Sequence, residues 1–142
     1  MTEPPAGATA PPLVPGLSAR VELTVTDADT AQTLGSGDVP VLGTPRVLAL
    51  VEAATVAATS TRMASGLTSV GTRVELEHLA ATPVGRTVTA EAHLVSVDGR
   101  RLMFDVVVHD GDAIAARGRV ERAVVDRQRF LQRTFGERTF GG

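Results

Sequence analysis

One apolar segment, residues 44–62 with the sequence TPRVLALVEAATVAATSTR, constrains the fold of this chain more than any other feature. Thr44 is a favourable N-cap residue, and Pro45 suits the first helical position, where its missing N–H leaves no hydrogen bond unmade. Apolar side chains occupy most sides of the segment, which is typical of a helix buried in a core. The segment therefore predicts a long central helix that the rest of the chain must cover.

The same segment carries a single ionisable residue, Glu52, between Arg46 and Arg62. Thr44, Leu48 and Glu52 follow an i, i+4, i+8 spacing and so lie along one stripe of the predicted helix. A buried carboxylate that lacks a partner is energetically costly. This stripe, with a hydroxyl at one end and a carboxylate two turns on, is the first candidate site.

Alternation of apolar and polar residues predicts five strands, one before the helix and four after it. Their residue ranges are 19–26, 71–80, 86–97, 101–109 and 113–125. Asp-Gly pairs at 98–99 and 110–111 separate the last three segments, and Asp-Gly between alternating runs is a strong hairpin signal. One antiparallel sheet curled around the central helix satisfies this order of elements.

The expected fold is therefore α+β, with about five strands wrapped around a long helix. We place this domain at residues 18–134. Residues 1–17 hold five of the eight prolines and favour a flexible arm. A short helix after the last strand should lead into a tail at residues 135–142.

Composition excludes several classes of protein. The chain has no cysteine or lysine, which excludes disulfides, thiol nucleophiles and lysine chemistry, and no spacing of ionisable residues resembles a metal site. A net charge of −2 does not indicate the positively charged surface that a nucleic-acid-binding protein requires. No apolar run is long enough to span a membrane, and the N-terminus lacks the features of a secretory signal. We expect a cytoplasmic protein with no metal, cofactor, nucleic-acid or membrane partner.

Two charged or titratable residues fall in the apolar phase of predicted strands: His78 in 71–80 and Arg122 in 113–125. Each candidate has a structural interpretation as well. His78 could be a satisfied core histidine, Arg122 could reach water from a strand end or pair with Glu52, and Thr44 could be only a cap. Together the four favour a functional cluster where the helix meets the sheet, because perturbed ionisable groups gather at functional sites.

The flanking residues of this cluster resemble the hot-dog-fold acyl-CoA thioesterases, most closely the fluoroacetyl-CoA thioesterase type. The similarity covers about residues 19–130 and is densest in VGTRVELEHLAATPVGRTVTAEAHLVSVDGRRLMFDVVVHDG and GRVERAVV. It implies that Thr44, Glu52 and His78 are catalytic. It also implies that the Gly71 N–H contacts the oxyanion and that Arg122 contacts Glu52 or the substrate. The resemblance further implies a homodimer with each active site built from both chains.

The function that follows is hydrolysis of an acyl-CoA thioester with a small or medium acyl group. His78 would be the base, acting on water or on Thr44, and Glu52 would orient His78 or water, or attack the carbonyl. A covalent intermediate and direct water attack both stay open. So do two other classes: a non-catalytic acyl-CoA or small-ligand binding protein, and a hot-dog dehydratase or hydratase.

The segment before Thr44 departs from the fluoroacetyl type, which carries phenylalanines there. Here the segment reads LGSGDVPVLGT, without an aromatic residue. An apolar gate that excludes water rewards one small acyl group. Without it we expect weak discrimination between fluoroacetyl and acetyl groups, unless Phe130, Phe135, Phe140 or a partner chain supplies the aromatic residues.

Overall fold

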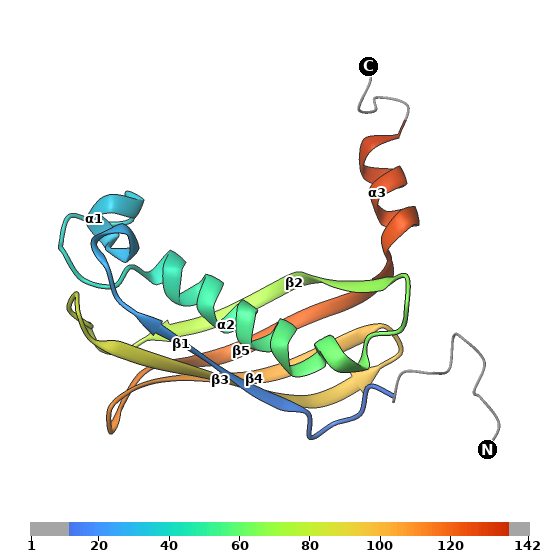
Figure 1. Ribbon diagram of the computed structural model, residues 1–142, viewed down its shortest axis with the longest axis horizontal. Helices are drawn as coiled ribbons and strands as arrows, with labels where there is room; N and C mark the ends of the chain where they lie inside the picture. The colour runs from blue at the N-terminus through green and yellow to red at the C-terminus, as the bar shows by residue number, and fades with distance from the viewer. Residues whose placement is uncertain (1–11, 137–142) are drawn as a thin grey trace.

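Five strands form one antiparallel sheet in the order β1-β3-β4-β5-β2, and a long helix lies across one of its faces (Figure 1). The computed structural model describes residues 12–136. The strands are β1 Ser18–Thr24, β2 Leu67–His78, β3 Thr87–Asp98, β4 Arg101–Asp110 and β5 Ala113–Asp126. The helices are η2 Asp27–Asp29, α1 Ala31–Leu34, α2 Thr44–Thr59, η3 Ser60–Arg62 and α3 Arg127–Phe135. The predicted α+β architecture is confirmed.

Helix α2 packs one face on the sheet through fully buried Val47, Val51 and Ala54. Its opposite face stays open in the single chain, where Val56 is 46% exposed and Ala53 is also exposed. The expectation of burial on most sides is therefore wrong for an isolated chain. An apolar face that its own chain does not cover is a candidate contact surface.

Both predicted hairpins are present. Asp98 pairs with Arg101 and Asp110 with Ala113, so each loop has two residues. Gly99 and Gly111 take the first loop position, each with φ of 60°. Such a positive φ favours glycine, which is why Asp-Gly marks these turns so reliably.

Residues 1–11 of the expected arm and 137–142 of the expected tail lie outside the described residues. The remainder of the arm contacts the core: Leu13 and Leu17 pack against it, and the Gly16 N–H donates to the Leu94 carbonyl at 2.8 Å. Among the described residues, no helix is both long and apolar enough to cross a membrane.

Candidate active site

Thr44 and His78 meet where the first residue of α2 approaches the last residue of β2. The Thr44 Oγ1 lies 2.7 Å from the His78 Nδ1. Thr44 is not the N-cap residue that the sequence suggested, because the helix begins at Thr44 itself and Gly43 takes the cap position without a side-chain hydrogen bond. The Thr44 hydroxyl thus makes its hydrogen bond with the imidazole of His78 and does not cap the helix.

The surroundings of His78 favour a neutral ring. Burial lowers the pKa of His78 below its usual value of 6.5, and a backbone hydrogen bond with Ala80 opposes this only in part. The Nε2 atom is buried and has no hydrogen-bond partner among the described residues. A neutral imidazole with one nitrogen on a hydroxyl is able to accept a proton near neutral pH.

A cavity of about 320 Å³ opens beside this pair. It is lined by Ala31, Ser36, Gly37, Val39, Val41, Leu42, Gly43, Thr44, His78, Leu79, Ala80 and Ala81. The segment before Thr44 therefore forms one wall of the cavity, and no phenylalanine lines the cavity. A pocket with a few converging polar groups in a small-residue wall suits a small ligand group.

Asp29 fixes this wall to the start of α2, a role that the sequence analysis missed. Its carbonyl accepts from the Gly43 N–H at 2.9 Å, and its Oδ1 accepts from the Arg46 Nε at 3.0 Å. Burial raises the pKa of Asp29, but hydrogen bonds from Thr26 and Arg46 outweigh burial and lower it overall. The sequence signal was Thr26 followed three residues later by Asp29, in Thr26-Asp27-Ala28-Asp29, and this pair forms a capping box here.

A second polar group surrounds Arg122, which is only 6% exposed. Its Nε donates to the Ser69 Oγ and its Nη2 to the Ser69 carbonyl, both at 2.9 Å, and its Nη1 lies 3.3 Å from the Glu52 Oε2. Burial lowers the pKa of Arg122 while the Glu52 charge opposes this, and the guanidinium stays protonated. The predicted Glu52–Arg122 ion pair is confirmed, and an Arg122 that reaches water is excluded.

Gly71 lies against the same carboxylate. A Cβ at this position would overlap the Glu52 Oε2, so only glycine allows Glu52 to approach the backbone. Strict alternation would point Gly71 outward with Arg73. The register of β2 against β5 shifts between these two residues, however, and the extra residue, Thr72, donates its hydroxyl to the Glu121 carbonyl at 3.1 Å. This bulge turns Ser69 and Gly71 toward α2.

The two groups do not meet within one chain. Thr44 and Glu52 are separated by about 12 Å along the helix axis, and His78 and Gly71 by about 20 Å along β2. No hydrogen bond or ion pair between residues 12 and 136 joins the Thr44–His78 pair to the Glu52–Arg122 pair. The structure thus brings the predicted residues together in two separate groups, Thr44 with His78 and Glu52 with Arg122 and Gly71.

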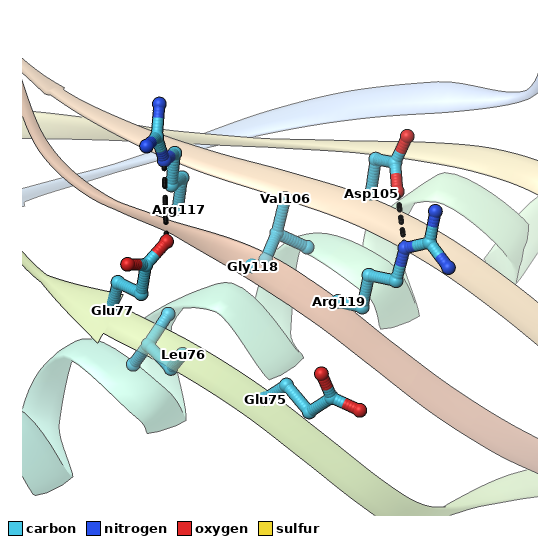
Figure 2. A pocket seen from close by; sticks show the side chains of 8 residues that line it. All are labelled: Glu75, Leu76, Glu77, Asp105, Val106, Arg117, Gly118 and Arg119. Carbon is cyan, nitrogen blue, oxygen red and sulfur yellow. Dashed lines mark hydrogen bonds and ion pairs between the residues drawn. The ribbon is translucent and has the colours of Figure 1, made fainter.

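A larger hollow of about 460 Å³ lies on the sheet face turned away from α2 (Figure 2). Its charges are paired: Glu77 with Arg117 at 3.4 Å and Asp105 with Arg119 at 3.3 Å. Because these four side chains are each more than half exposed, their ion pairs contribute little and their charges are screened by water. We therefore assign the site to the helix side of the sheet.

Comparisons with known proteins show which family the chain is similar to. The family model of the fluoroacetyl-CoA-specific thioesterases matches residues 25–128. The fluoroacetyl-CoA thioesterase of Streptantibioticus cattleyicolor is 42% identical over 90 residues, which span 63% of this chain and 65% of the relative, less than two thirds of its length.

Solved structures support the same fold. A fluoroacetyl-CoA thioesterase superposes with a TM-score of 0.81 at 32% identity, covering 88% of this chain and 97% of that one. A hot-dog-like protein from Thermanaerovibrio acidaminovorans gives a TM-score of 0.79 at 25% identity, covering 90% of this chain and 94% of that one. The hot-dog fold predicted from the sequence is confirmed, and the chain belongs to the family of fluoroacetyl-CoA-specific thioesterases.

Proposed function

We propose that this protein hydrolyses acyl-CoA thioesters to the free acid and CoA. The observation that carries the proposal is the Thr44 Oγ1–His78 Nδ1 contact of 2.7 Å at the wall of a cavity. Burial that lowers the pKa of His78 keeps the imidazole neutral, as a general base must be. Membership of a thioesterase family supports the same reaction.

Two routes fit this geometry. In the first, His78 removes the proton from the Thr44 hydroxyl, whose oxygen attacks the thioester carbonyl carbon and expels the CoA thiolate. Water then hydrolyses the acyl ester. In the second, His78 removes a proton from water, which attacks the carbonyl directly, and Thr44 orients the ring. In both routes the proton held by His78 can neutralise the departing thiolate.

The complete site in this proposal requires two chains. One carbonyl cannot contact His78 and the Gly71 backbone of the same chain when these lie about 20 Å apart along β2. Strand β2 is an edge strand of 12 residues, and its free edge is a template for pairing with another strand. If two β2 strands pair antiparallel about a two-fold axis, His78 of one chain approaches the Ser69–Gly71 end of the other.

In such a homodimer the Glu52–Arg122 half-site serves the His78 of the partner. The Gly71 N–H would contact the developing oxyanion, and Arg122 would hold the Glu52 carboxylate in place to orient water or attack the carbonyl. The exposed apolar face of α2, with Val56 and Ala53, supports a contact between chains. Sedimentation showing a monomer at micromolar concentration would contradict this assembly.

We propose a small or medium acyl group, which suits a cavity of about 320 Å³ beside His78. The cavity wall from Ser36 to Leu42 lacks an aromatic gate. A change of one group in a pocket is worth about 1–3 kcal/mol of discrimination, so fluoroacetyl-CoA and acetyl-CoA should react with similar kcat/KM. A preference above about a thousandfold, roughly 4 kcal/mol, would refute this account. A cytoplasmic location is part of the same proposal.

The decisive experiment measures kcat/KM for fluoroacetyl-, acetyl- and a branched acyl-CoA with wild-type protein, His78→Ala and the matched control His93→Ala. His93 is an exposed histidine of β3. Removing a general base should lower kcat/KM by about 10²- to 10⁴-fold, whereas His93→Ala should not change it. If the wild type shows no turnover and His78→Ala still binds acyl-CoA, the protein is instead an acyl-CoA binding protein.

A further inference from the structure

Helix α3 has little cover from its own chain. None of its residues is buried, and Leu131 is 42% exposed. Figure 1 shows α3 standing clear of the sheet and of α2, beyond the end of β5 and on the side where β2 forms the sheet edge. Phe130 and Leu131 lie on one side of this helix and Arg129 and Arg133 on the other. An amphipathic helix with an exposed apolar side needs a further surface to cover it.

The same helix concentrates positive charge. It carries Arg127, Arg129 and Arg133 and no acidic residue. Within residues 12–136, none of these three arginine side chains forms an ion pair, because all the ion pairs involve arginines outside α3. Arg129 and Arg133 are four residues apart and share one side of the helix. The Asp126 carboxylate at the start of α3 accepts from the Arg129 backbone N–H at 2.9 Å and is in ion-pair contact with neither guanidinium. Two neighbouring guanidinium groups that form no ion pair among the described residues suit the recognition of phosphate.

The position of α3 in the chain places it near the partner chain in the proposed dimer. The helix follows Asp126, which pairs with Leu67 at the start of β2. When two β2 strands pair antiparallel, the start of one strand lies beside the end of the other. The cavity next to His78 is at that end, and Val39 and Leu79 on its wall are each 50% exposed. Helix α3 of one chain is thus directed at the cavity mouth of the other.

We propose that α3 of each chain packs its apolar side on the mouth of the partner's cavity, and that Arg129 and Arg133 bind the CoA phosphates there. The inference rests on the proposed thioesterase function and on pairing through β2. When the thioester lies beside His78, the pantetheine arm leads outward, so the pyrophosphate and the 3′-phosphate must sit outside the cavity. A cationic helix at the rim would hold these groups and exclude water from the acyl end.

The first test compares acetyl-CoA with S-acetylpantetheine, which has the same thioester and no phosphate. In Arg129→Gln/Arg133→Gln the ratio of kcat/KM for acetyl-CoA to that for S-acetylpantetheine should fall at least tenfold, chiefly through KM. The matched control is Arg117→Gln/Arg119→Gln, which removes the same charge from the far face of the sheet (Figure 2). The control should leave the ratio unchanged.

The second test asks which chain α3 serves. Two differently tagged chains are co-expressed, one with His78→Ala and the other with Arg129→Gln/Arg133→Gln, and the mixed dimer is purified on both tags. Its only intact His78 lies in the chain whose own α3 is altered. If α3 acts on the partner, this site receives the unaltered helix, and KM for acetyl-CoA stays at the wild-type value. A raised KM in the mixed dimer would overturn the proposal.

The outcomes separate the two proposals. If the wild type hydrolyses neither thioester, the proposed thioesterase function fails. If the wild type hydrolyses both and the α3 variant keeps its preference for acetyl-CoA, thioesterase function stands and the inference about α3 is refuted. A ratio that falls equally in the Arg117/Arg119 control would also refute it, because the effect would then be general electrostatic attraction.

Discussion

Replacing Arg122 with methionine tests whether the buried ion pair holds the Glu52 half-site together. Methionine keeps an apolar stem of similar length but leaves Ser69 without both of its 2.9 Å hydrogen bonds and Glu52 without its partner at 3.3 Å. Removing one partner of a buried pair costs about 3–5 kcal/mol. The Glu52 side chain is 32% exposed and can be hydrated. We therefore expect the free energy of unfolding to fall by about 3 kcal/mol, the lower end of this range. The melting temperature should fall by about 10 °C.

Arg119→Met is the matched control. Arg119 lies on the same strand, and its Nε is also 3.3 Å from a carboxylate oxygen, that of Asp105. The difference is exposure, since the side chains of Arg119 and Asp105 are 63% and 54% exposed while that of Arg122 is 7% exposed. An exposed pair contributes little, so Arg119→Met should change the free energy of unfolding by less than about 0.5 kcal/mol.

Urea unfolding followed by far-UV circular dichroism measures both variants, because the chain has no tryptophan or tyrosine to report by fluorescence. Protein concentration must be held constant, since the proposed dimer would make the unfolding midpoint concentration-dependent. If Arg122→Met lowers the free energy of unfolding by less than about 1 kcal/mol, or by no more than Arg119→Met does, Arg122 is not a buried charge compensated by Glu52.

Four further predictions follow from the site and the termini. Because burial lowers the pKa of His78, the acid limb of kcat/KM should have its midpoint below pH 6.5; the unfolded chain takes up this proton first, so stability should also fall as pH drops below 6.5. Gly71→Ala should displace Glu52 and reduce turnover, and a crystal structure with the Glu52–Arg122 pair intact would contradict the overlap. Thr44→Ser should retain most activity and Thr44→Val should lose it, as measured by kcat/KM. Deleting residues 1–11 should leave the melting temperature unchanged in a thermal scan, because their Pro/Gly/Ala composition offers little to pack.

The elements of the fold could be predicted from the sequence because their signals are local. The run of apolar residues after Thr44-Pro45 predicts the central helix, and alternation with Asp-Gly pairs predicts three strands joined by two hairpins. Each of these signals depends on neighbouring residues in one segment, so no knowledge of distant contacts is needed. The resemblance implied the roles that we propose for Gly71 and Arg122, which composition and periodicity do not show.

The sequence by itself determined which residues are chemically unusual for their positions: Thr44, Glu52, His78 and Arg122. Only the tertiary structure decided which of them meet, that Ser69 holds Arg122, and that the five predicted residues lie in two separate groups. The bulge at Thr72 gives the physical reason. Side chains alternate with a period of two along a strand, so one extra residue reverses the facing of Ser69 and Gly71. That extra residue is set by the pairing of β2 with β5 across the sheet, which no local pattern encodes.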